Sequence, residues 1–146
     1  MSIEVDIIIR LLLSVIFGGA IGYVREIKRK AAGLRTHMLV CMGSAIFTLV
    51  SIYMAQDGGM NADPTRIAAS VVTGIGFIGA GAIFQMGGSV KGLTTAASIW
   101  VCAALGLAVG AGYYDIATFS TILALIVIQL LQTVERKFVR PSEREG

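Results

Sequence analysis

The sequence predicts an all-α, polytopic membrane protein with five transmembrane helices and glycine-rich packing between them. Of its 146 residues, 55% are hydrophobic, only 14% are charged and 18 are glycine, and the mean hydropathy is +0.80. A soluble domain carries about a quarter charged residues, so this chain lacks the polar groups that would cover a water-exposed surface. Its apolar residues gather into stretches close to the roughly 20 residues that cross a bilayer as a helix.

Five apolar stretches divide the chain: residues 7–23, 36–55, 67–86, 93–113 and 116–134. The basic cluster of the first stretch follows it, whereas a signal peptide has its basic region in front. We therefore expect this stretch to be retained as a helix. The pattern predicts one membrane domain over residues 1–134 and a short basic tail over residues 135–146, disordered towards its end.

The distribution of basic residues predicts the orientation. In a five-span arrangement ten of the twelve Lys and Arg residues fall on one side, and the positive-inside rule makes that side cytoplasmic. The N-terminus is then outside and the C-terminus inside. The sequence pI of about 9.1 is explained by this topology and by anionic lipid, and no aromatic residues interleave with the basic ones to favour nucleic-acid binding.

Residues 74–79 of the third stretch carry a G-x-G-x-x-G pattern, formed by Gly74, Gly76 and Gly79. A dinucleotide-binding loop needs a preceding strand and an acidic residue about twenty positions further on, and neither is indicated here. Together with Gly81, these glycines place small residues on two faces of a helix, which favours close packing of membrane helices. We therefore expect a centrally packed third helix, with Gln85 hydrogen-bonding across helices near its inner end.

A shift of 59 residues suggests an internal repeat. It aligns Gly22 with Gly81, Gly33 with Gly92, Leu34 with Leu93, Thr36 with Thr95, Ala45 with Ala104, and Val50 with Val109. Each unit reads as a glycine-containing helix, a turn and a second helix that opens with G-L-x-T, and both units start on the same side, so the repeat is parallel. Chance matching in a glycine- and alanine-rich sequence is the alternative.

The two G-L-x-T units place Thr36 and Thr95 at helix N-termini on the predicted cytoplasmic side. There they can satisfy free backbone N–H groups. These positively polarised helix ends, next to Arg35 and Lys91, can also receive an anion. Plain capping with lipid-headgroup contact is the simpler interpretation.

Charged residues at the predicted outer side form a second group of candidates. Arg10 stands about one turn into the first helix, where it either snorkels to the interface or pairs with Asp63. Asp63 and Pro64 suit the cap and first turn of the third helix. Capping does not explain Arg66, which we expect to point towards the outer surface.

At the inner end of the first helix, Arg25 complements the helix dipole whereas Glu26 opposes it. We expect Glu26 to pair with Arg29 or Arg35. His37 is the single histidine, and we interpret it as an interfacial side chain, with pH sensing as the alternative.

Three segments together resemble the MgtC/SapB family of bacterial inner-membrane proteins: GGAIGYVREIKRKAAGLRTHMLVCMGSA, DPTRIAASVVTGIGFIGAGAIF and VKGLTTAASIWVCAALG. The resemblance covers roughly residues 7–112. It implies a five-helix membrane protein linked to adaptation to low magnesium and, in pathogens, to virulence. Some members are described as inhibiting the F-type ATP synthase through a membrane contact.

The sequence departs from the family pattern in two places. Virulence-associated members carry a soluble ACT-like domain after the fifth helix, where this sequence continues as VERKFVRPSEREG, so we expect a short form without that domain. Ser70 stands where the family often has glutamine, a stronger hydrogen-bonding residue.

Two function classes remain open. One is a regulatory protein that acts by helix contacts, and the other is a small transporter or channel for an ion or anionic solute. Cys41 and Cys102 lack metal-ligand spacing and are expected in the core, and we expect no metal, cofactor or enzymatic activity. The unfilled small-residue faces predict a homodimer with the third or fourth helix near its axis and with Gly22, Glu26 and Arg66 near the ends of the interface.

Overall fold

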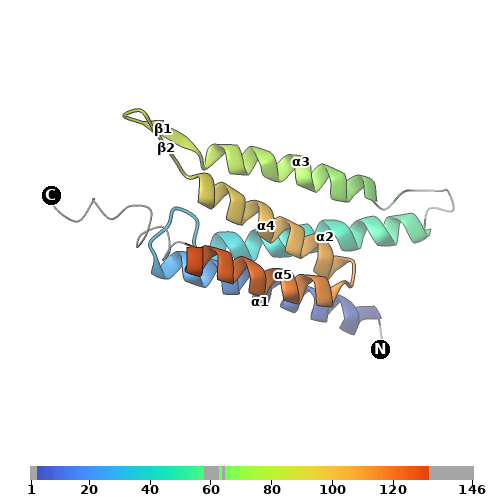
Figure 1. Ribbon diagram of the computed structural model, residues 1–146. Helices are drawn as coiled ribbons and strands as arrows, with labels where there is room; N and C mark the ends of the chain where they lie inside the picture. Colours follow the sequence, from blue (N-terminus) through green and yellow to red (C-terminus); the bar gives the residue numbers. More distant parts are fainter. Residues whose placement is uncertain (1–2, 58–62, 64, 132–146) are drawn as a thin grey trace.

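A computed structural model describes residues 3–57, 63 and 65–131 as an antiparallel bundle of five helices (Figure 1). The elements are α1 (Ile3–Ile27), α2 (Leu34–Asp57), α3 (Thr65–Gly81), β1 (Phe84–Met86), β2 (Ser89–Lys91), α4 (Leu93–Gly110), α5 (Tyr114–Ile126) and a π-helical turn, η1 (Val127–Leu131). The predicted all-α membrane fold with five helices is confirmed. The expected tail, residues 135–146, and Pro64 lie outside the described residues.

Among the described residues, three helices are long and apolar enough to cross a bilayer by length and composition: Ile3–Ile27, Leu34–Gln56 and Leu93–Gly110. The apolar parts of the other two are shorter, Ala68–Gly81 in α3 and Tyr114–Leu130 in α5 with η1. At 1.5 Å per residue, α3 with its 17 residues is about 25 Å long, somewhat less than the hydrocarbon core of about 30 Å.

Two helix ends are closed by backbone geometry. At the end of α1, Arg29 adopts a positive φ of 48°, and the N–H groups of Arg29 and Lys30 bond the carbonyls of Glu26 and Arg25. At the end of α4, Gly112 has a φ of 86°, and the N–H groups of Gly112 and Tyr113 bond the carbonyls of Val109 and Ala108. This is the Schellman arrangement, which satisfies the last carbonyls of a helix. It turns the chain sharply at both ends of the bundle.

The third apolar stretch is not helical throughout. We expected a helix over residues 67–86, but α3 ends at Gly81 and a short antiparallel hairpin follows. Gln85 therefore pairs with Val90 in this hairpin and is not on a helix. Gly87 and Gly88 form its two-residue turn, both with positive φ, which is the backbone that the favoured hairpin turns require.

The central helix is α4, not α3 as the sequence had suggested. It contacts α1, α2, α3 and α5, and half of its span is buried inside the structure. In Figure 1, α3 lies along the edge of the bundle beside α4 and α2. The two predicted core cysteines, Cys41 and Cys102, are both fully buried, free and part of one apolar cluster, so their expected core position is confirmed.

Glycines hold α4 against α2 at backbone distance. A Cβ on Gly106 would overlap the carbonyl oxygen of Cys41, and one on Gly110 would stand 2.8 Å from the carbonyl oxygen of Ala45. Small residues let membrane helices approach in this way. On α1, Gly22 does the same, because its Cβ would stand 2.8 Å from the Cα of Leu34.

The starts of α2 and α4, at Leu34 and Leu93, are separated by the 59 residues of the proposed repeat, 93 − 34 = 59. In both halves the preceding helix packs on the following one, α1 on α2 and α3 on α4. The repeat as a whole stays a prediction.

Candidate functional site

Polar side chains gather at the two ends of the bundle. The basic end carries the loop between α1 and α2 and the hairpin between α3 and α4, which lie at the same end in Figure 1. Its basic residues are Arg25, Lys28, Arg29, Lys30, Arg35 and Lys91. The opposite end carries the start of α1 and the end of α4.

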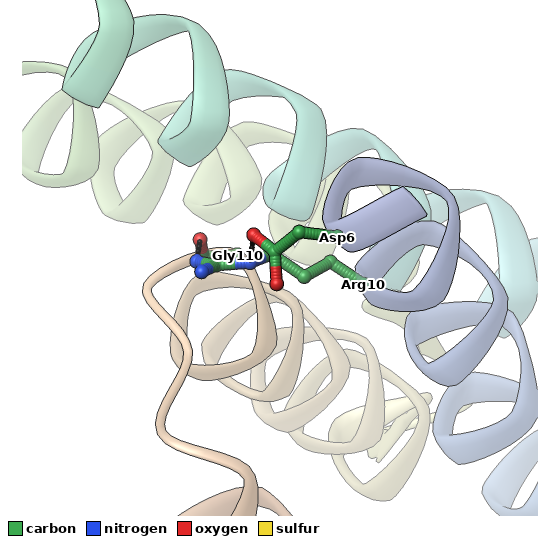
Figure 2. Close-up of polar contacts among 3 residues, drawn as sticks. All are labelled: Asp6, Arg10 and Gly110. Carbon is green, nitrogen blue, oxygen red and sulfur yellow. Dashed lines mark hydrogen bonds and ion pairs between the residues drawn. The ribbon is translucent and has the colours of Figure 1, made fainter. Parts of the chain in front are cut away.

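At the opposite end, Arg10 joins α1 to α4 (Figure 2). Its Nε lies 2.7 Å from Oδ2 of Asp6, and its Nη1 donates to the carbonyl oxygen of Gly110 at 2.7 Å. The side chains of Arg10 and Asp6 are 20% and 27% exposed. The expected pairing of Arg10 with Asp63 is therefore wrong, because a carboxylate one helical turn away is the nearer partner.

Asp63 caps α3, as expected. Its Oδ1 accepts hydrogen bonds from the hydroxyl of Thr65 at 2.7 Å and from the backbone N–H of Thr65 at 2.8 Å. These bonds, the hydroxyl one first, hold the pKa of the Asp63 carboxyl below its ordinary value because they stabilise the charged form. The side chain of Arg66 is exposed, and its expected direction towards the outer surface stays a prediction.

At the basic end, Arg25 is buried inside the bundle. It is only 2% exposed, and its Nη2 donates a short hydrogen bond to Oγ1 of Thr95 on α4. Its Nε has no hydrogen-bond partner in the described part of the chain, and no carboxylate there pairs with it. A buried charge without a counter-ion costs several kcal/mol, so this arginine is the most costly polar group of the described interior.

His37 lies in the same polar cluster and is fully buried, so its interpretation as an interfacial side chain is wrong. Its Nδ1 lies 2.7 Å from the carbonyl oxygen of Gly33 and must donate to it, since a carbonyl only accepts. Its Nε2 lies 3.0 Å from Oγ of Ser98, and this hydroxyl also lies 2.8 Å from the carbonyl oxygen of Thr95. A neutral His37 that donates through Nδ1 accepts at Nε2, so the one Ser98 hydroxyl hydrogen donates either to this nitrogen or to the carbonyl oxygen of Thr95. These polar contacts connect α1, α4 and α2, from Arg25 to His37.

The start of α2 is capped by Glu26, not by Thr36. Oε2 of Glu26 accepts a hydrogen bond from the N–H of Leu34 at 3.0 Å, which corrects the expected pairing of Glu26 with Arg29 or Arg35. Thr36 is half-buried, and the hydrogen bonds found for the described residues do not include its side chain. Thr95 does not cap α4 either, because its hydroxyl binds Arg25 and the N-cap of α4, Gly92, has no side-chain bond.

The glycines of α3 contact little within the chain. A Cβ on Gly79 would lie 3.7 Å from Cβ of Ala96 on α4, an ordinary contact. A Cβ on Gly74, Gly76 or Gly81 would meet nothing within 4 Å in the described structure. The expected close packing on two faces of this helix is therefore absent inside the chain. Gly22 lies between α1 and α2 and cannot line an interface with a second copy.

Residues 11–137 match the MgtC family. This chain belongs to the MgtC family. Over 129 residues the MgtC-family chain is 48% identical to the putative magnesium transporter YhiD of Escherichia coli K12, an alignment that covers 86% of the chain and 60% of that protein.

It is 40% identical over 131 residues to the protein MgtC of Brucella abortus, with 90% of the chain and 53% of that protein covered. With the protein SapB of Bacillus subtilis it shares 41% identity over 140 residues, 92% of the chain and 60% of that protein. The MgtC-family chain thus spans between half and two thirds of these relatives, and no solved structure gives a significant match.

Proposed function

We propose that this MgtC-family chain is a regulatory inner-membrane protein of magnesium adaptation that acts through helix contacts with a membrane partner, without conducting Mg²⁺ and without catalysing a reaction. The F-type ATP synthase is the partner that the family resemblance favours. We further propose that the N-terminus lies outside and the basic end lies in the cytoplasm, following the positive-inside rule.

The buried charge of Arg25 is the observation that carries this proposal. Mg²⁺ is bound by oxygen ligands, usually with one or two carboxylates, and a buried guanidinium repels it. The other buried polar side chains of the described interior are the hydroxyls of Ser and Thr together with His37. The α2–α4 contact is closed by Gly106 and Gly110 at backbone distance, which leaves no ion path between these two helices.

Reconstitution tests the proposal directly. Proteoliposomes with an enclosed Mg²⁺-sensitive dye should show no influx above protein-free vesicles, while a divalent-cation ionophore added at the end confirms that the dye responds. Co-reconstitution with F-type ATP synthase should lower its rate of ATP hydrolysis in proportion to the amount of chain added. Saturable Mg²⁺ influx would contradict the regulatory proposal and would favour magnesium transport, the activity in the name of the relative YhiD.

An anion transporter is the second candidate, and the same Arg25 favours it because a buried cation lowers the cost of bringing an anion into the bundle. The same vesicles loaded with chloride or phosphate distinguish the two: a regulatory protein leaves the anion efflux at the level of protein-free vesicles.

We also propose that the chain forms a homodimer through α3. Gly74 on α3 and Gly43 on α2 line a groove of about 530 Å³, and Phe77 on α3 is 85% exposed. Single cysteines placed along residues 68–81 in a background lacking Cys41 and Cys102 should cross-link with helical periodicity in membranes. A monomeric mass in mild detergent together with no cross-linking would contradict the dimer.

A further inference from the structure

We propose that the basic end holds a phospholipid, with its phosphate bound by Arg25 and the first turn of α4 and one acyl chain in the groove between α4 and α5.

The phosphate part of the site starts from the unpaired donors of Arg25. This side chain is 98% buried, since its exposed fraction is 2%, and its Nη2 donates to the neutral hydroxyl of Thr95. The Nε hydrogen has no acceptor among the described residues. A guanidinium presents its N–H donors as a fork that matches the oxygens of a phosphate, so an oxyanion supplies both the missing acceptor and the missing charge.

The first turn of α4 adds a second set of donors at the same place. Thr95, which binds Arg25, is the third residue of this helix. The N-cap residue Gly92 makes no side-chain hydrogen bond to the first N–H groups of α4. Such helix N-termini bind phosphate because the free N–H groups and the helix dipole act together.

The loop between α1 and α2 brings further positive charge to this end. It contains Lys28, Arg29 and Lys30, and its Ala32 belongs to the same buried cluster as Ile99 of α4. The loop therefore packs over the part of α4 that follows Thr95. A basic cluster at the end of membrane helices attracts anionic headgroups.

An apolar groove next to this phosphate site identifies the ligand as a lipid and not as free phosphate. The groove has a volume of about 460 Å³, lies between α4 and α5, and is lined by Thr94, Ser98, Ala104 and Ala108 among others. Thr94 is the neighbour of Thr95, and Ser98 takes part in the polar contacts between Arg25 and His37. From Thr94 to Ala108 the groove follows α4 for about 21 Å at 1.5 Å per residue, which is more than the depth of one leaflet, about half of a 30 Å core.

Ile21 also lines the groove and lies one helical turn before Arg25 on α1. The apolar groove therefore begins next to the buried arginine, as the acyl chain of a lipid begins next to its headgroup.

Native mass spectrometry of the full chain, released from mild detergent, tests the proposal with three probes: dioleoyl phosphatidylglycerol, dioleoylglycerol and inorganic phosphate. We expect phosphatidylglycerol to bind at least tenfold more tightly than dioleoylglycerol, which has the same chains and no phosphate. In Arg25→Gln the preference for phosphatidylglycerol over dioleoylglycerol should be lost, so that the two lipids bind equally. Arg35→Gln is the matched control, because it removes an exposed arginine at the same end and should leave the preference unchanged.

Ala104→Phe tests the acyl-chain part independently. Ala104 is exposed and lines the groove, so a phenyl ring there fills the groove without entering the core, and it should weaken phosphatidylglycerol binding while leaving phosphate binding unchanged. Equal binding of phosphatidylglycerol and dioleoylglycerol, or a tenfold preference retained in Arg25→Gln, would overturn the phosphate site. Binding of inorganic phosphate that depends on Arg25, with lipid binding untouched by Ala104→Phe, would overturn the lipid and leave a free-phosphate site only.

Discussion

Replacing Gly106 by alanine tests whether the contact between α4 and α2 holds the bundle together. The added Cβ would overlap the carbonyl oxygen of Cys41 and would also come 2.7 Å from Cβ of Ser44. The alanine side chain is this Cβ methyl group alone and has no χ angle that could move it away, so relief requires the two helices to separate. We therefore expect a large loss of stability from the smallest possible change.

The magnitude follows from two opposing effects. Inserting a methyl group into a well-packed core costs about 1–3 kcal/mol, and the overlap with a backbone atom places Gly106→Ala at about 3 kcal/mol. Alanine has a higher helix propensity than glycine and stabilises a helix by roughly 1 kcal/mol at such a position. The net loss is about 2 kcal/mol, which corresponds to roughly a 30-fold lower folding equilibrium constant.

The matched control is Gly43→Ala on α2. Within one chain, nothing in the described structure lies within 4 Å of a Cβ at this position. For the monomer only the gain in helix propensity therefore remains, and the monomeric variant should be as stable as the wild type or up to about 1 kcal/mol more stable. Trp100, the single tryptophan, lies on α4, so its fluorescence during titration of mixed micelles with sodium dodecyl sulfate reports unfolding. If Gly106→Ala unfolds no earlier than the wild type, the close approach of α4 to α2 is refuted.

Three further predictions concern other parts of the chain. A reporter fused after Gly146 should be cytoplasmic, and one inserted at Gly58 should lie on the outer side. Finding both reporters on the same side would exclude the three membrane spans expected between these two positions. Glu26→Ala should lower the free energy of unfolding by about 0.5–2 kcal/mol because it removes the acceptor of the Leu34 N–H. Glu26→Gln keeps an acceptor oxygen and should lose less stability, and equal losses in the two variants would argue against the cap. The pKa of Asp63, followed by NMR titration, should lie below its ordinary value, so its contribution to stability is present above the unfolded-state pKa and is lost as the pH falls through the folded-state pKa. An unshifted titration would contradict the hydrogen bonds to Thr65.

The sequence could predict the interior position of Arg25 from the spacing of its helix. Ser14, Gly18, Ile21 and Arg25 recur at intervals of three or four residues, so they lie on one face of α1, and all four are buried. The small residues on this face, Ser14 and Gly18, mark it as one that packs against neighbouring helices. An arginine that continues such a face is carried into the bundle, and helix periodicity alone indicates this.

The early end of α3 also has a local signal that composition obscures. Residues 82–86 are apolar enough to extend a membrane helix, which is why a helix to Met86 was expected. The pair Gly87–Gly88 between residues that suit strands is a hairpin signal, and it outweighs hydropathy here because two successive positive φ angles cannot continue a helix.

The pairing of side chains across helices could not be predicted from one sequence. The bond between His37 and Ser98 joins residues 61 positions apart, and the bond between Arg25 and Thr95 joins residues 70 positions apart. Each depends on the rotation of one helix against another, which is set by the glycine contacts of Gly106 and Gly22. No local pattern encodes that rotation, so Thr95 was expected to cap its own helix.

The two arginines of α1, the partly exposed Arg10 and the buried Arg25, show why the basic end is the better place for a ligand. Arg10 has a carboxylate, Asp6, one turn away and a carbonyl oxygen on α4, so its charge is neutralised and its donors tie two helices together. Arg25 makes the equivalent connection to α4 through a hydroxyl, which accepts a hydrogen but brings no negative charge. Arg10 thus links two helices at the opposite end with its charge balanced by Asp6, whereas Arg25 at the basic end is a cation without a counter-ion among the described residues. Because an isolated buried charge is costly, a bound anion stabilises the folded bundle at the basic end and has no comparable effect at the opposite end.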